Sequence, residues 1–202
     1  MGFLDAVLGR GRRSAAPAKR DRLFALTTAY VTLETSLSIT TSGVAAIVFQ
    51  PLATADFATV TKDVQEIVAA TGGETGTTVE TTEDTFGYRW MILRDDDVED
   101  LVVGVNAVRD ALAEGGYADR VLCAVFGFAE GTGGPDAGPG GAGRPLYLIY
   151  NEKRGTWYPF VPAGGEQQRD SEAELRLRAQ LGSDLPLEPE VDRWLALWGI
   201  PI

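Results

Sequence analysis

Two stretches of the chain repeat apolar residues every three or four positions, the spacing of a helix with one buried side. They cover residues 54–70 and 98–114, and each is followed by a pair of glycines, which are typical of helix ends. A run of three aspartates, residues 95–97, puts negative charge where the second helix would begin. The apolar side of that second helix consists of Val98, Leu101, Val102, Val105, Val108 and Leu112.

Most other apolar residues lie in short alternating runs, or in runs rich in valine, isoleucine and aromatic residues, which predict β-strands. The Asn-Glu-Lys-Arg-Gly turn at 151–155 joins two such runs and predicts a hairpin. A short helix is expected at 21–28, and a helix that continues through Leu33 is an alternative to the first strand. The expected strands cover 29–39, 43–50, 75–82, 87–94, 119–129, 146–150 and 156–161.

Because the strands come in hairpins with helices between them, the pattern predicts an α+β fold. We expect a mainly antiparallel sheet with helices packed on one face. Two strand–helix–hairpin units suggest a loose internal duplication. Two short C-terminal helices are expected, the first beginning near Ser171 with Asp170 as its cap. The second would carry an apolar edge of Trp194, Leu195, Leu197 and Trp198 and dock on the body of the protein. If it does not dock, the edge is an exposed patch and a partner site.

Composition limits the size and class of the fold. The chain has 202 residues, of which 45% are hydrophobic, and these values are typical of a globular protein with a real core. We expect one domain over 20–202, with a flexible insertion at 131–143 that contains seven glycines and two prolines. The single cysteine, Cys123, cannot form an internal disulfide and fits a reducing cytoplasm.

The net charge of −11 is distributed unevenly. Residues 1–22 hold six basic and two acidic residues, whereas the rest of the chain holds 12 basic and 27 acidic residues. An acidic body repels phosphate groups, so a nucleic-acid partner is not expected. A basic end on an acidic body could instead contact an anionic membrane surface or an acidic protein.

Residues 1–19 are expected to form a basic amphipathic tail and a linker. Four apolar residues fall on one side of a short helix, and three arginines follow them, which predicts membrane contact at the inner face of the cell membrane. Arginines placed after the apolar run reverse the order of a secretory signal. The alternatives are a helix end that packs on the body or a frayed terminus. The residues concerned are Phe3, Leu4, Val7 and Leu8, with Arg10, Arg12 and Arg13.

Residues that commonly carry catalysis are scarce. The chain has no histidine, so neither a catalytic triad nor an ordinary zinc site is expected, and the glycine-rich insertion lacks the lysine and hydroxyl of a phosphate-binding loop. The three consecutive aspartates cannot converge on one metal ion. We therefore expect a protein without enzymatic activity, metal or cofactor. Paired-carboxylate catalysis stays formally open for Glu152, Glu166, Asp170, Glu172, Glu188 and Asp192.

The hairpin at 146–161 combines cations with aromatic residues. Lys153, Arg154, Trp157 and Tyr158 could form a surface that binds a partner, because arginine and aromatic residues dominate binding hot spots. Lys153, Arg154 and Trp157, together with Arg169, could instead line a pocket between the sheet and the helices that binds a small molecule or forms the site of a weak enzyme. The simpler alternative is that the aromatic side chains belong to the core and the cations decorate the turn.

Several segments together resemble one known family, and the likeness runs through almost the whole chain. These segments are MGFLDAVLGR, RDRLFAL, FGYRWMILR, KRGTWYPFVP, LPLEPEVDRW and the final LWGIP. They resemble the PspA-associated protein PspAB family. The glycine-rich insertion is longer than the family pattern, which implies that this loop is not required.

The resemblance implies an accessory or regulatory protein of the PspA-type phage-shock, or envelope-stress, response. It implies a PspA-type partner and supplies no catalytic residues. Genes of the family lie near genes for HtpX-like membrane metalloproteases, so a role as an assembly factor for such a protease is an alternative.

Overall fold

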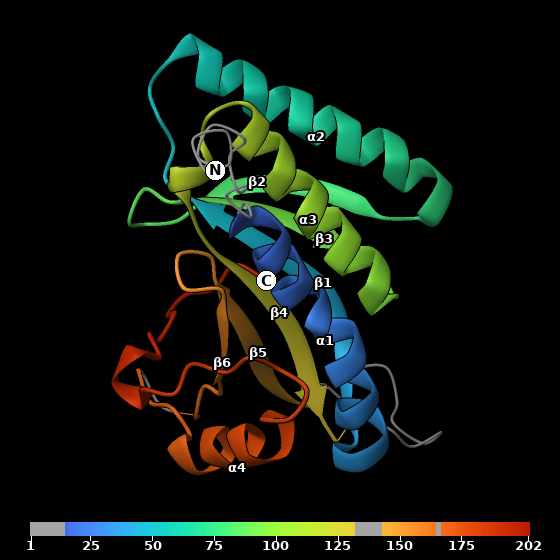
Figure 1. Cartoon of the computed structure of the whole chain (residues 1–202), viewed down its shortest axis with the longest axis vertical. Helices are drawn as coiled ribbons and strands as arrows, with labels where there is room; N and C mark the ends of the chain where they lie inside the picture. Colours follow the sequence, from blue (N-terminus) through green and yellow to red (C-terminus); the bar gives the residue numbers. More distant parts are fainter. Residues whose placement is uncertain (1–14, 132–142, 165–166) are drawn as a thin grey trace, which may run out of the picture.

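The computed structural model describes residues 15–131, 143–164 and 167–202 (Figure 1). The predicted membrane-contact residues at 3–13 and most of the glycine-rich insertion lie outside these ranges. The described chain forms an antiparallel six-stranded sheet with four α-helices, which confirms the α+β prediction. The elements are α1 (Ala15–Leu37), β1 (Ile39–Phe49), α2 (Ala55–Thr75), β2 (Thr78–Glu83), β3 (Arg89–Arg94), α3 (Val98–Glu114), η1 (Ala118–Arg120), β4 (Val121–Glu130), β5 (Arg144–Asn151), β6 (Thr156–Phe160), α4 (Ser171–Leu181) and η2 (Val191–Arg193).

The strand order is β2-β3-β1-β4-β5-β6, so β1 and β4 form the centre of the sheet. Ala46 of β1 lies between Ile92 of β3 and Val125 of β4. One half of the sheet is a plain meander, β4-β5-β6. In the other half, the chain leaves β1, crosses over through α2 and returns in β2 and β3. Each half therefore has three strands, but the chain visits them in a different order, so the suggested duplication holds for the kinds of element and not for the strand order.

The helices cover one face of the sheet, as predicted (Figure 1). Alternate residues of β1, among them Ile47 and Phe49, point toward the helices and are fully buried. α3 has the bounds predicted from its apolar stripe, and the Asp97 side chain caps it by accepting a hydrogen bond from the Glu99 backbone N–H. The stripe and the cap agree, which is why this helix could be located from the sequence.

The strand expected at 29–39 is wrong, because α1 is a continuous helix from Ala15 to Leu37. It begins inside the segment expected to be a linker. Its buried side is narrow, and the threonines on its other sides produce an alternation that resembles a strand. The helix ends where Ser38 adopts a positive φ of 54°, and β1 begins at the next residue. The buried side consists of Leu23, Leu26, Ala29 and Leu33.

Two other boundaries differ from the prediction. α2 continues through the glycine pair at 72–73 and ends at Thr75, just before Gly76, which has a φ of +93°. Of the two short C-terminal helices, the first is α4, and the second is only the single 3-10 turn η2. Proline lacks the N–H that a helix needs, and Pro186 and Pro189 precede this turn.

Candidate functional site

The face of the sheet opposite the helices is also apolar. Val44, Ala46 and Val48 point to this face from β1, and Cys123 and Val125 do so from β4. The C-terminal segment, residues 186–202, covers part of it, and its Trp198 ring packs against the ring of Phe160 at a centroid distance of 5.1 Å. The segment begins beside β6, where the Trp157 backbone N–H donates to the Pro186 carbonyl. We call residues 186–202 the strap. This extended segment covers its face of the sheet in place of the helices that cover the other face.

The strap leaves a groove of about 960 Å³ open at one end of the sheet. Its floor includes Val48, Trp90, Cys123 and Tyr158, which belong to four different strands. Its walls are the β2–β3 turn, the start of β4, the β5–β6 turn and residues 195–198 of the strap. Large apolar side chains on these walls are open to solvent, with exposed fractions of 75% for Phe86, 38% for Leu122 and 61% for Leu195.

The polar groups of the groove floor are not poised for proton transfer near neutral pH. Burial raises the pKa of the Cys123 thiol to about 12 and also raises the pKa of the Tyr158 hydroxyl. Both groups therefore stay protonated at neutral pH. The arrangement is suited to contact with apolar groups.

Asp84 organises the β2–β3 turn that forms one wall. Its carboxylate accepts hydrogen bonds from the Trp90 indole N–H at 2.9 Å and from the backbone N–H groups of Phe86 and Tyr88 at 2.9 Å each. Burial raises the pKa of Asp84, but these hydrogen bonds outweigh it and the pKa is lowered overall. The turn is thereby fixed with the Phe86 ring exposed.

Charges of both signs line the mouth of the groove. Lys153 and Arg154 are exposed on the β5–β6 turn, and the Arg154 guanidinium lies 3.8 Å from the buried Glu188 carboxylate. Glu152 lies 3.9 Å from Arg109 of α3, and Asp119 lies 3.5 Å from Arg120. An apolar centre with a charged rim is the usual composition of a protein-binding surface.

The structure separates the four hairpin residues that the sequence singled out. Lys153, Arg154 and Tyr158 line the groove, whereas Trp157 is fully buried on the helix face. The Trp157 indole N–H donates to the Arg22 carbonyl at 2.8 Å, and its ring packs against Tyr150. The Trp157 side chain therefore belongs to the core and does not line the groove.

Sequence reasoning identified Leu195 of the walls, as part of the apolar edge at 194–198, but not Phe86 or Leu122. Phe86, Leu122 and Leu195 lie far apart in the chain, and only the strand order brings their segments together. One available signal was Phe86 itself, a large aromatic residue in a turn that otherwise contains polar residues and glycine.

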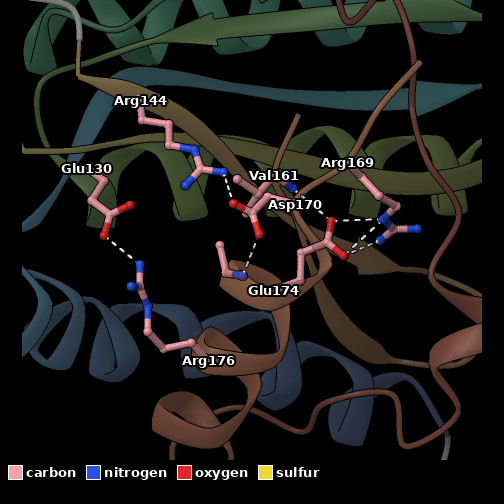
Figure 2. Close-up of polar contacts among 8 residues, drawn as sticks. Glu130, Arg144, Val161, Arg169, Asp170, Glu174 and Arg176 are labelled. Carbon is pink, nitrogen blue, oxygen red and sulfur yellow. Dashed lines mark hydrogen bonds and ion pairs between the residues drawn. The ribbon is translucent and has the colours of Figure 1, made fainter. Parts of the chain in front are cut away.

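A group of ion pairs and hydrogen bonds fixes α4 to the sheet (Figure 2), and one of its members, Arg169, also bonds the strap. The buried Glu174 carboxylate accepts from the Val161 backbone N–H at 3.0 Å and from Arg169, whose Nε lies 2.9 Å and 3.0 Å from its two oxygens. Arg169 also donates to the Trp194 carbonyl at 2.8 Å and lies over the Phe160 ring. One buried pair therefore connects α4, the end of β6 and the strap.

The other pairs in Figure 2 lie nearer the surface. Asp170 caps α4 by accepting from the Ala173 backbone N–H at 2.8 Å, as predicted, and it also pairs with Arg144. The Ala173 N–H and then Arg144 hold the pKa of Asp170 below its ordinary value. Arg176 pairs with Glu130 at 2.7 Å. These contacts give the carboxylates of α4 a structural role.

The aspartate run has a similar explanation. Asp97 caps α3, and Asp95 accepts hydrogen bonds from the Thr77 hydroxyl and the Asp97 backbone N–H. Within the described ranges, no three His, Cys, Asp or Glu residues come together as a potential metal site. Among the same residues, none of the helices has the length and apolar character that crossing a membrane requires.

Comparison with known families gives one result for the full length of the chain. The model of the family described as PspA associated protein B (PspAB) matches residues 1–202. The searches of curated proteins and of solved structures found no match.

Proposed function

We propose that this chain, which belongs to the PspA associated protein B family, is a non-enzymatic accessory protein that contacts a PspA-type protein through the open groove. The family description supplies the partner. The observation that favours this surface is the exposure of Phe86, Leu122 and Leu195 around a groove of about 960 Å³. Exposed apolar groups that gather in one place commonly mark an interaction site.

Burial of these side chains by a partner would contribute to the free energy of binding. Full burial of one such side chain is worth about 1.5–3 kcal/mol, and part of this gain offsets the cost of association. Aromatic anchors that enter a pocket are typical hot spots. Lys153, Arg154 and Asp119 at the mouth would orient the partner, because rim charges influence association rate and specificity more than affinity.

The test is co-purification at low salt of a tagged chain with a PspA-type protein. The groove variant carries Phe86→Asp and Leu122→Asp, and the control carries Leu175→Asp on the outer side of α4, where the leucine is 48% exposed. We expect the wild type and the control to retain the partner and the groove variant to lose at least about tenfold in retention. No retention by the wild type contradicts the accessory role, and equal retention by all three chains contradicts the groove.

The N-terminal residues extend the proposal to the membrane. Phe3, Leu4, Val7 and Leu8, followed by Arg10, Arg12 and Arg13, would bring the chain to an anionic surface at the cytoplasmic side. Sedimentation with vesicles that contain anionic lipid should pellet the full chain and leave a chain without residues 1–14 in solution. Equal pelleting of both chains contradicts this element of the proposal.

A further inference from the structure

We infer that the open groove is a docking site for a basic amphipathic segment, and that its resting occupant is this chain's own residues 2–13. The inference rests on the proposed function only in treating the groove as the partner's surface. It makes access of a partner conditional on release of the N-terminal segment. Three features carry it: the place where α1 begins, the apolar match and the charge match.

The first feature is the position of α1. The Arg22 guanidinium donates to the Gly155 carbonyl at 3.3 Å, so the N-terminal part of α1 lies against the β5–β6 turn. The same turn presents Lys153 and Arg154 to the groove. Ala15, the first residue of α1, precedes Arg22 by seven residues, or about 10 Å of helix. Residues 9–14, which link the apolar residues to α1, could span roughly 20 Å when extended, and this is the reach available for passing around the turn.

The second feature is the apolar match. Phe3, Leu4, Val7 and Leu8 fall on one side of a helix of two turns. A helix this short is marginal by itself in water and needs an apolar surface to stabilise it. The groove offers such a surface on its exposed walls and on its floor, among them Phe86, Tyr88, Leu122, Leu195 and Trp198. Docking an amphipathic helix in an apolar groove is a common mode of recognition.

The third feature is charge. The segment continues into Arg10, Arg12 and Arg13, whereas residues 23–202 carry 12 basic against 27 acidic residues. Three carboxylates, Asp84, Asp119 and Glu152, line the groove against the two cations of the β5–β6 turn, so its lining also carries more negative than positive charge. A tethered segment also has an effective concentration of the order of millimolar, which favours it over the same segment of a second copy.

Cross-linking between engineered cysteines tests the occupant without any partner. Cys123 is the chain's single cysteine, so Cys123→Ser provides a background without thiols, and Cys123→Ala replaces it if the serine variant folds poorly. The test chain adds Val7→Cys and Leu122→Cys. The control adds Val7→Cys and Leu175→Cys, because Leu175 is another exposed leucine and does not line the groove.

We expect mild oxidation to form an intramolecular disulfide at least about tenfold faster in the test chain than in the control, a ratio that an effective concentration of this order allows. Replacing Arg10, Arg12 and Arg13 by Glu should slow the reaction in the test chain alone. Equal rates in the test and control chains overturn the inference. Disulfide-linked dimers whose share falls on dilution overturn it in favour of a second copy as the occupant.

Partner binding separates this inference from the proposed function. If both are correct, removing residues 1–14 raises retention of the PspA-type protein several-fold, because the groove is released. Unchanged or lower retention by the shortened chain overturns the regulatory inference. A fast cross-link in a chain that never retains the PspA-type protein overturns the proposed function, while the assignment of residues 2–13 to the groove is supported.

Discussion

The helix face and the strap face of the sheet are both apolar, but they are closed by different means. On the helix face, side chains from α1, α2, α3 and α4 form one continuous core with the strands. On the strap face, an extended segment with a single 3-10 turn covers part of the sheet and leaves the groove. Its attachment depends on a few polar contacts, among them those of Arg169 and Glu188.

The difference shows how one sheet can serve both stability and recognition. A helix brings several apolar side chains and satisfies its own backbone hydrogen bonds, so it closes a face without external partners. An extended strap satisfies fewer of its own backbone groups and needs partners outside itself, such as the Arg169 side chain that donates to the Trp194 carbonyl. We therefore expect substitutions on the helix face to affect folding most, and those of the exposed groove residues to affect mainly binding.

The largest expected effect comes from Trp157→Ala on the helix face. The residue is fully buried, and its indole bonds the Arg22 carbonyl, so the free energy of unfolding should fall by about 3–5 kcal/mol. Trp198→Ala on the strap face is the matched control and should cost about 1–2 kcal/mol, because Trp198 is only partly buried. Urea unfolding measures both. Equal losses would mean that the two faces contribute alike to folding.

Glu174→Gln should have the next largest effect, because it leaves Arg169 without its buried ion-pair partner. Loss of one partner of a buried pair costs about 3–5 kcal/mol, and partial exposure of the Arg169 side chain reduces the expected cost to about 2–3 kcal/mol. That side chain is 24% exposed.

The strap should respond before the rest of the protein does. We expect limited proteolysis of the Glu174→Gln chain to cut within residues 186–202 several-fold faster than in the wild type. The control is Glu172→Gln, because Glu172 is an exposed glutamate in the first turn of α4. It should change neither the free energy of unfolding nor the rate of cleavage in the strap appreciably. A strap that is cut no faster in the variant would show that the pair does not hold it.

The helix face was largely predictable from the sequence, because local signals there agree with the tertiary fold. For α3 the stripe and the Asp97 cap both indicate the helix that forms. The exception, α1, has few buried positions and many threonines, so its local pattern resembles a strand. Only packing of Leu26 and Leu33 against the sheet decides in favour of the helix.

The strap face was predicted less well, and the groove was not predicted. Trp194 and Trp198 suggested a second terminal helix, but prolines and the pairing of residues 186–188 with β6 keep this segment extended. The groove depends on four chain segments that meet only through the order of the strands. No local pattern contains this information. Lys153 and Arg154 are exposed on the β5–β6 turn, as the sequence of the turn predicts, because a turn presents its side chains outward.

A smaller effect, with a defined pH dependence, is expected at Asp170 on α4. Its pKa in the folded protein lies below the ordinary value of 3.8, so its charge stabilises the folded state fully at pH values well above 3.8. This contribution begins to fall as the pH drops past about 3.8 and is lost below the lowered pKa. Asp170→Asn keeps a side chain that can cap the helix but removes the charge.

The stability difference between wild type and Asp170→Asn should therefore stay constant between about pH 7 and pH 5 and shrink as the pH falls through about 4. Urea midpoints of both chains across this range measure it, and comparing the two chains cancels the titration of the other carboxylates. A difference that grows on acidification would contradict the sign of the effect.

The smallest effect on folding is expected at the groove, for Phe86→Ser. The ring is 75% exposed, and the turn that carries it is fixed by Asp84 through backbone and indole hydrogen bonds that the substitution leaves in place. The free energy of unfolding should change by no more than about 0.5 kcal/mol. Retention of the PspA-type protein should nevertheless fall, because the side chain belongs to the proposed binding surface.

A loss of stability above about 1.5 kcal/mol would place Phe86 in the core. The groove residues would then contribute to the stability of the fold. The helix face could no longer be distinguished from the strap face as the one that stabilises the protein.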